Sequence, residues 1–387
     1  MNSIRIQQIK PSATIEMEGT VAALKEAGVD VISLNAGEPD FDTPENICRA
    51  CTKAMQEGQT KYVTVSGILP LKKAICAKLL RDNHVSYEPS EIVVSTGAKQ
   101  ALYNAIACIC NPGDEVIIPT PCWVSYEEIV HLVDAKVVLV PTHVGDFQLD
   151  LDAIRAAITP KTKAIIINSP NNPTGVVYSA ETLTRMAELL TEKSRAYGHT
   201  IYLVSDEPYR DIAFDGRPVP YPAAFYPHTL TCFSFSKSLS LPGERLGYVA
   251  VRPGCEGEDL LVDMMAQISR FTGHNCPPSI IQRAVSRCLN VTSDLSVYET
   301  NMNLLYDKLK ALGFEVERPG GTFYIFPKAL EEDANAFCLR ARDYDLLLVP
   351  SDSFGVKGYV RLAYCIDTEK VERSLPALEK LAASYRK

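Results

Sequence analysis

The chain has 387 residues, of which 46% are hydrophobic and 22% charged, and its formal net charge is −8. These values are ordinary for a folded globular protein, and the length allows two domains with separate cores. The basic residues are scattered along the chain, which argues against a partner such as a nucleic acid or a membrane surface.

The first residues contain no apolar run typical of a signal peptide, and no stretch approaches the ~18 apolar residues of a membrane span. We therefore predict a cytoplasmic protein. Most of the twelve cysteines lie in apolar segments, where cysteine behaves as a small buried hydrophobe. Cys48 and Cys51 have a spacing that also fits redox chemistry or half of a zinc site. No second pair follows at zinc-ribbon spacing, and the segment is typical of a helix that begins after Pro44.

From about residue 45 to residue 276, short apolar runs alternate with helical patterns. Several runs are continuous and rich in β-branched residues, as in strands that are buried on both faces of a parallel sheet. The predicted strands are 91–95, 114–119, 136–141, 163–168, 200–205, 229–235 and 247–251. Between them lie helices with recognisable starts, such as the one that Ser179 caps. The pattern predicts an α/β fold with a mostly parallel seven-stranded sheet between helices.

After about residue 290 the pattern changes. A long helical segment at 292–312 precedes short apolar runs at 346–350 and 358–364 and a terminal helix. This arrangement predicts a smaller α+β domain. We therefore expect a large domain at 46–285, a small domain at 286–387, and an N-terminal segment at 1–45 that packs with the small domain.

Polar and aromatic residues directly follow five of the predicted strands. Since open parallel sheets bind ligands beyond the carboxyl ends of their strands, these residues are expected to meet at one edge of the sheet. The segments are "STGAKQ" (95–100), "TPCW" (120–123), "NSPNNPTG" (168–175), "DEPYR" (206–210) and "SKSLS" (236–240). The phosphate-loop, zinc-protease and dinucleotide-binding motifs are absent, and the six histidines are dispersed, so we predict no metal site.

What remains is a lysine, an aspartate, a tyrosine, two arginines and an asparagine-rich turn. Lysine amines form Schiff bases with carbonyl cofactors, of which pyridoxal phosphate is the leading example. That cofactor requires a lysine for its aldehyde, an acid against its pyridinium nitrogen, a phosphate cradle and donors to its phenolic oxygen. The sequence offers candidates for each of these.

The chain resembles a class I, fold-type-I aminotransferase of the aspartate aminotransferase superfamily. Four motifs carry the resemblance in the family's order and spacing, and it extends from near residue 9 to Arg361. They are "NSPNNPTG" (168–175), "SDEPYR" (205–210), "SFSKSLSLPGERLGY" (234–248) and "GYVRLAY" (358–364). The resemblance implies pyridoxal 5′-phosphate as cofactor, and an amino acid and a 2-oxo acid as substrates.

It also implies roles for residues around the cofactor ring. Lys237 matches the lysine that binds the aldehyde, and Asp206 matches the carboxylate beside the pyridinium nitrogen. Tyr209 and Asn172 match the donors to the phenolic oxygen, and Trp123 matches the aromatic residue that stacks on the ring. The structural alternatives are a helix cap for Asp206, a turn residue for Asn172 and a core aromatic for Trp123.

A second group is implied around the phosphate. Arg245 resembles the phosphate-binding arginine, and hydroxyls of Ser234 and Ser236 are expected beside it. The backbone amides of Ala98 and Lys99 open a helix and can meet the phosphate there. Tyr62 resembles a tyrosine that reaches the phosphate of the neighbouring subunit, which implies a homodimer with shared active sites.

The remaining implied residues concern the substrate. Arg361 matches the arginine that binds the α-carboxylate, with the Gly37 backbone, Asn172 and Trp123 beside it; a structural salt bridge is the alternative for Arg361. A side-chain carboxylate would meet Lys99, Ser12 and Thr14. This favours aspartate or glutamate as donor and 2-oxoglutarate or oxaloacetate as acceptor.

Other substrates and reactions stay open. Lys99 is alternatively a solvated residue, and aromatics such as Tyr126 also suit a pocket for aromatic or other neutral amino acids. A lyase or decarboxylase on the same scaffold is a further alternative. A regulator that binds pyridoxal phosphate without catalysis would need an added DNA-binding domain. The chain departs from many relatives in "PGE" (242–244) and in segment 272–279, where His274 and Asn275 leave substrate choice open.

Overall fold

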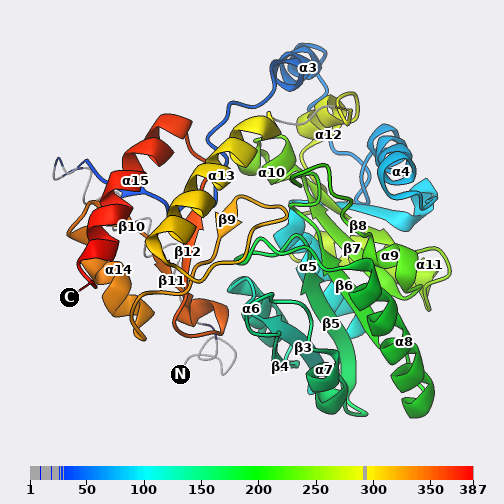
Figure 1. Ribbon diagram of the computed structural model, residues 1–387. Helices are drawn as coiled ribbons and strands as arrows, with labels where there is room; N and C mark the ends of the chain where they lie inside the picture. Colours follow the sequence, from blue (N-terminus) through cyan, green and yellow to red (C-terminus); the bar gives the residue numbers. More distant parts are fainter. Residues whose placement is uncertain are drawn as a thin grey trace, which may run out of the picture.

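The computed structural model describes residues 30–290 and 294–386, together with residues 9, 19, 26 and 28. Figure 1 shows a larger part built on a long twisted sheet and a smaller part that contains α13, α14 and α15. The predicted residues Ser12 and Thr14 lie outside the described residues.

The larger part is organised by a seven-stranded sheet, as predicted. Strand β8 runs antiparallel to both of its neighbours, and the other pairings are parallel. In spatial order the strands are β2 (Ile92–Ser95), β8 (Gly247–Val251), β7 (Thr229–Ser234), β6 (Tyr202–Asp206), β5 (Thr162–Asn168), β3 (Glu115–Thr120) and β4 (Lys136–Pro141). Each predicted strand segment overlaps one of these strands, and the boundaries agree within two residues.

Helices cover both faces of the sheet, and every strand except the edge strand β4 is buried almost throughout, which explains most of the continuous apolar runs. Along β3, Val116 and Ile118 pack into one core cluster, while Ile117 packs into another on the opposite face. The first face is covered by α5 (Ala98–Ile109), α6 (Ser125–His131) and α11 (Glu258–Phe271). The opposite face is covered by α4 (Leu69–Asn83), α7 (Leu151–Ala157), α8 (Ala180–Tyr197), α9 (Pro222–Phe225) and α12 (Ser279–Val285).

Helix boundaries follow local signals in the sequence. Helix α8 begins after Ser179, whose hydroxyl accepts a hydrogen bond from the Thr182 amide at 3.0 Å. The same helix ends at Gly198, which adopts a left-handed conformation with φ of 71°. Helix α3 (Glu45–Gln56) begins after Pro44 and contains the C-x-x-C pair, as predicted, and all twelve cysteines of the chain are free thiols.

The smaller part contains an antiparallel sheet of β11 (Val349–Pro350), β12 (Val360–Ala363) and β9 (Tyr324–Ile325). Strand β1 (Ile32–Ser33) pairs with β10 (Leu346–Leu347), so residues 32 and 33 contact the C-terminal region. The next residue, Leu34, belongs to the same core cluster as α13 (Leu295–Leu312), α14 (Ala334–Arg342) and α15 (Thr368–Ala383). The remaining described elements are short. They are α10 (Phe235–Ser238) and the 3-10 helices η1 (Pro89–Glu91), η2 (Pro242–Glu244) and η3 (Ser351–Phe354).

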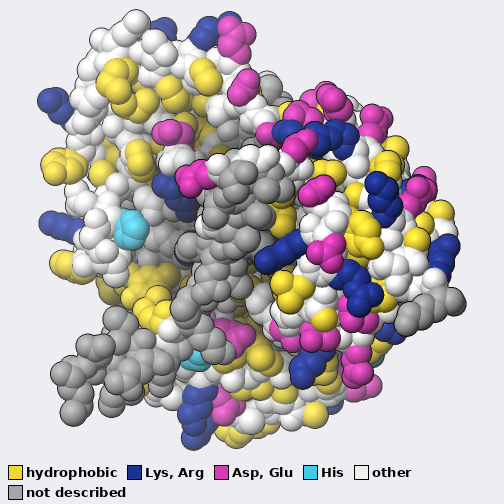
Figure 2. Space-filling model, turned by 90° about the vertical axis from the view of Figure 1, so that its left-hand side faces the viewer, with side chains coloured by type: hydrophobic (Ala, Val, Ile, Leu, Met, Phe, Trp, Pro, Cys, Tyr) yellow, Lys and Arg dark blue, Asp and Glu magenta, His cyan; other side chains and the backbone are white. Residues whose placement is uncertain are grey.

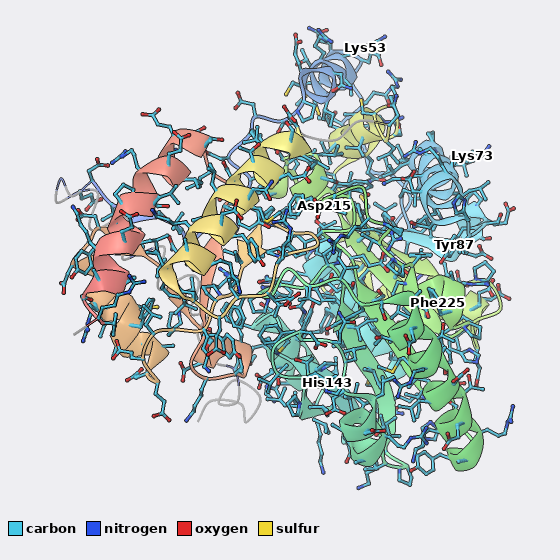
Figure 3. All side chains as sticks on the ribbon, viewed as in Figure 1. Lys53, Lys73, Tyr87, His143, Asp215 and Phe225 are labelled. Carbon is cyan, nitrogen blue, oxygen red and sulfur yellow. The ribbon has the colours of Figure 1, made fainter. Side chains whose placement is uncertain are left out.

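Charged side chains are distributed over the described surface. On the face shown in Figure 2, basic and acidic side chains are intermingled. Exposed lysines such as Lys53 of α3 and Lys73 of α4 lie at the outer edge of the larger part (Figure 3). Within the described part of the chain, no helix combines the length and apolar character needed to cross a membrane.

Candidate active site

The carboxyl ends of β5, β6 and β7 border a cavity of about 440 Å³ that residues of the smaller part also line. Strand-terminal residues Asn168, Asp206 and Ser234 all face it. Most of the predicted site residues line this cavity. They are Gly37, Ala98, Lys99, Trp123, Asn172, Asp206, Tyr209, Ser234, Ser236, Lys237, Arg245 and Arg361.

Lys237 lies on the short helix α10 (Phe235–Ser238), directly after β7. Its Nζ donates a hydrogen bond to the Gly37 carbonyl at 2.6 Å and lies 5.6 Å from the centre of the Phe323 ring. Burial lowers the pKa of Lys237 to about 8, although Cys365 and Glu38 act in the opposite direction. A sizeable fraction of the amine is therefore neutral near pH 8, as a nucleophile or a base requires.

Asp206 is the last residue of β6 and is buried. Its Oδ2 accepts a hydrogen bond from the Tyr126 hydroxyl at 2.6 Å, whereas its buried Oδ1 has no hydrogen-bond partner among the described residues. Burial raises the pKa of Asp206 to about 7, although the Tyr126 hydrogen bond lowers it. Asp206 caps none of the described helices, so the helix-cap alternative finds no support there. Tyr126 does not line the cavity but contacts Asp206 from behind it.

The asparagine-rich turn after β5 connects two sides of the cavity. The Asn172 amide donates to Asn168 Oδ1 at 2.7 Å, and Asn168 Nδ2 donates to the Asp206 carbonyl at 2.8 Å. Asn172 Oδ1 in turn accepts a hydrogen bond from Arg361 Nη1 at 3.1 Å. The Asn172 side chain therefore links the larger part to the arginine of β12.

Anion donors gather where α5 begins. The first amides of α5, at Ala98 and Lys99, have no partner within the helix. Arg245 Nη2 donates to the Thr96 carbonyl at 3.2 Å, and a Cβ atom on Gly97 would lie 2.5 Å from the same nitrogen. The hydroxyls of Ser234 and Ser236 also line the cavity and lie 2.8 Å apart. Amides, hydroxyls and a guanidinium in one place suit a phosphate group.

Arg361 lies in the middle of β12 and is only 2% exposed. Its Nη2 donates to the Asn35 carbonyl at 3.0 Å, and its buried Nε has no hydrogen-bond partner among the residues that the structure describes. No carboxylate of the described residues forms an ion pair with it, so the salt-bridge alternative finds no support in this part of the chain. A buried guanidinium without a carboxylate partner is costly, and an anionic ligand would compensate its charge.

Lys99 lies at the edge of the cavity, with its Nζ 5.0 Å from the centre of the Trp123 ring. Burial and the neighbouring Arg245 lower its pKa. Tyr62 is 88% exposed and does not line the cavity of the single chain. His274 also lies outside the cavity, where its Nδ1 is 3.1 Å from the Thr96 hydroxyl.

Six residues that line the cavity were not predicted: Ala36, Glu38, Asn168, Pro208, Pro242 and Tyr324. Of these, Glu38, Asn168 and Tyr324 have polar side chains. Asn168 ends a predicted strand, so its position alone could have found it. Glu38 is adjacent to the predicted Gly37. Tyr324 gave no such signal, because it lies in an apolar run that is typical of a core strand.

Known proteins resemble nearly the whole chain. The family model for aminotransferase class I and II matches residues 29–378. The aspartate/prephenate aminotransferase of Thermus thermophilus is 37% identical, with 96% of each chain covered, and the aspartate aminotransferase of Geobacillus stearothermophilus is 37% identical with 97% of each covered.

Solved structures agree with these matches. An aminotransferase from Eubacterium rectale superposes with a TM-score of 0.94 at 34% identity, covering 99% of this chain and 98% of its own. The Thermus thermophilus aspartate aminotransferase with maleate gives a TM-score of 0.91 at 35% identity, covering 98% and 99%. The chain therefore belongs to the class I and II aminotransferases and is a pyridoxal-phosphate-dependent enzyme.

Proposed function

We propose that the cavity beside Lys237 is where this aminotransferase binds its cofactor and substrates. The observation that carries the proposal is Oδ1 of Asp206, a buried carboxylate oxygen that has no hydrogen-bond partner in the described part of the chain. It lies at a cavity that also contains a lysine amine. Such an oxygen suits a protonated ring nitrogen, and the donors at the start of α5 suit a phosphate. The residues present therefore fit pyridoxal phosphate.

Each side chain around the ring then has a role. Lys237 would hold the aldehyde, and Asp206 would keep the pyridinium nitrogen protonated. Tyr209 and Asn172 would donate to the phenolic oxygen, and Trp123 would stack on the ring. When bound, the cofactor supplies an electron sink and carries the amino group between two substrates.

The phosphate and the substrate would meet separate groups. Arg245, the Ser234 and Ser236 hydroxyls and the first amides of α5 would bind the phosphate. Arg361 would bind the substrate α-carboxylate, close to Asn172 and Gly37. The Lys237 amine, once released, would take a proton from the substrate Cα, for which its lowered pKa is suited.

We further propose aspartate or glutamate as the amino donor. The support is the position of Lys99, a lysine at the cavity rim, and the names of the relatives, several of which are aspartate aminotransferases. An ammonium group would bind the side-chain carboxylate of such a donor. The Thermus thermophilus relative is named an aspartate/prephenate aminotransferase, so prephenate joins 2-oxoglutarate and oxaloacetate as an acceptor to test.

A panel of amino donors at fixed 2-oxoglutarate tests this assignment. We expect the highest kcat/KM for aspartate or glutamate, and Lys99→Ser should lower it roughly 10–100-fold, because one hydrogen bond to a charged group is lost. Lys163→Ser is a matched control, since Lys163 also lies over an aromatic ring, at 5.4 Å from Tyr202, but does not line the cavity. An aromatic or aliphatic donor ranking above aspartate would show that the pocket assignment is wrong, as would an unchanged ranking in Lys99→Ser.

We also propose a homodimer with shared active sites. Tyr62 and Phe271 are 88% and 80% exposed, and large apolar side chains of this kind favour a protein interface. The Ser279 hydroxyl donates to the Gln59 carbonyl at 2.8 Å, so the segment after Phe271 lies beside the loop that carries Tyr62. In a dimer, Tyr62 would reach the phosphate of the neighbouring subunit.

Mixing Tyr62→Phe chains with Lys237→Ala chains tests the shared site. In each hybrid one site contains both defects and the other contains neither, so activity above that of the separate variants is expected. Random exchange would leave about a quarter of all sites intact. Native mass spectrometry should confirm that hybrids have formed. Confirmed hybrids without recovered activity would contradict a shared site.

Two further proposals concern organisation and location. The contacts of β1 with β10 and of Leu34 with the C-terminal core support a small domain at 286–387 joined by segment 1–45, beside a large domain at 46–285. The twelve free thiols support a cytoplasmic location, where cysteines stay reduced.

A further inference from the structure

Tyr324 lies between the cofactor side and the substrate side of the cavity. It belongs to β9 and is paired with Ala363 of β12. Because side chains alternate along a strand, Arg361 projects from the same face of this sheet as Ala363 and therefore as Tyr324. Tyr324 is 2% exposed and lines the cavity. None of the motifs that identify the family contains it.

The ring and the hydroxyl of Tyr324 contact different groups. The Arg361 guanidinium carbon lies 4.4 Å from the ring centre, a cation–π geometry. The hydroxyl oxygen lies 3.3 Å from the Tyr209 hydroxyl oxygen, and either can be the donor. The rings of Tyr209 and Tyr324 meet edge to face, with centres 5.7 Å apart.

Close backbone packing fixes Tyr324 in this position. A Cβ atom on Gly37 would lie 1.9 Å from the Tyr324 hydroxyl oxygen, so only glycine leaves room for it there. On the other side, a Cβ atom on Gly175 would lie 2.8 Å from the Tyr324 carbonyl oxygen. The Gly320 amide donates to the Gly175 carbonyl at 2.9 Å, which holds the turn before β9 against the asparagine-rich turn.

We propose that Tyr324 is a positioning residue that donates a hydrogen bond to the Tyr209 hydroxyl while its ring holds the Arg361 guanidinium. This inference rests on the proposed roles of Tyr209 and Arg361. A hydroxyl that accepts a hydrogen bond becomes a better donor, because consecutive hydrogen bonds polarise one another. Tyr324 therefore strengthens Tyr209 as a donor to the phenolic oxygen of the cofactor.

The consequence is a lower proton affinity of that phenolic oxygen, because a hydrogen bond to the charged form stabilises it. Other charged and titratable groups lie near Tyr209, Tyr324 and Lys237, and substitution of Tyr324 leaves all of them in place. They are Glu38, Asp206 of β6, Lys237 of α10, Arg361 of β12 and Cys365.

The test is a pH titration of the visible absorption band of the holoenzyme. Tyr324→Phe removes the hydroxyl and keeps the ring, so the midpoint should rise by about 0.5 pH unit or more, a threefold or larger gain in proton affinity. The same substitution in a Tyr209→Phe background should cause no further shift. Without the Tyr209 hydroxyl, the hydrogen bond from Tyr324 can no longer act on the phenolic oxygen. Maleate binding, measured from its effect on the spectrum, should stay within about twofold of wild type because the ring under Arg361 remains.

Tyr324→Leu removes the ring as well and should weaken maleate at least tenfold. If Tyr209→Phe shifts the midpoint but Tyr324→Phe leaves it at the wild-type value, the proposed hydrogen bond from Tyr324 to Tyr209 is wrong, while the role of Tyr209 stands. If Tyr324→Leu binds maleate as tightly as wild type, the ring of Tyr324 does not hold the Arg361 guanidinium for binding. If Tyr209→Phe itself causes no shift, the proposed role of Tyr209 is wrong, and with it the inference.

Discussion

Lys237→Ala is expected to lower transamination by at least on the order of 10⁴-fold. Removal of the amine eliminates both the group that would hold the cofactor aldehyde and the base that would move the substrate Cα proton. A positioned acid–base group by itself contributes on the order of 10²–10⁴-fold. The purified wild-type protein should be yellow, and the variant should lose the pH-dependent visible band of the wild type. Steady-state kinetics and absorption spectra of both proteins measure these effects.

The same substitution should leave the protein folded. Lys237 makes a hydrogen bond to the Gly37 carbonyl but no ion pair with the described residues, so its loss leaves no carboxylate unpaired there. Lys72→Ala is a matched control, because Lys72 is also buried but lies outside the cavity. That control should retain most activity and the yellow colour. Substantial turnover in Lys237→Ala would refute the assignment of the catalytic lysine.

Asp206→Asn should have opposite effects on catalysis and on the stability of the cofactor-free protein. Without the negative charge, the pyridinium nitrogen loses its partner, and kcat should fall on the order of 10²–10³-fold. In the cofactor-free protein, however, burial raises the pKa of Asp206 to about 7, above the ~3.9 of an unfolded aspartate. The buried carboxylate is therefore costly wherever it is ionised.

The sign of the pH dependence follows from this raised pKa. Between pH 4 and pH 7 the folded protein binds more protons at Asp206 than the unfolded chain does, so stability falls as pH rises through this range. Above pH 7 the ionised, buried carboxylate lowers the free energy of unfolding by its full amount, up to about 4 kcal/mol. The amide that replaces the carboxylate carries no charge, so Asp206→Asn should unfold at higher urea than wild type at pH 8, and the difference should vanish near pH 4.

Urea unfolding of both cofactor-free proteins between pH 4 and pH 8 measures this effect. Tyr126→Phe provides a comparison, because it removes the hydrogen bond that lowers the Asp206 pKa. That variant should lose stability at pH 8 and resemble wild type near pH 4. A pH-independent difference between Asp206→Asn and wild type would show that Asp206 does not titrate with a raised pKa.

Local patterns in the sequence were sufficient for the α/β architecture. The apolar runs predicted each strand of the large sheet, because all of these strands except the edge strand β4 are buried on both faces and need apolar residues throughout. The N-cap at Ser179 and the helix after Pro44 were also predictable, since capping involves residues within one helical turn. Lys237, Asp206 and Asn172 lie at or just after the ends of strands in recognisable motifs, so the sequence alone predicts that they meet at one edge of the sheet.

Contacts between distant segments were not predictable, because they leave no local pattern in the chain. Tyr126 and Asp206 are 80 positions apart, and Lys237 and Gly37 are 200 apart, yet each pair shares a hydrogen bond. The place of Tyr324 beside both Tyr209 and Arg361 depends on how β9 and β12 pack against the large sheet. Residue types and spacing therefore identified the chemistry, whereas long-range packing determined the burial, and with it the pKa values, of the groups that would perform it.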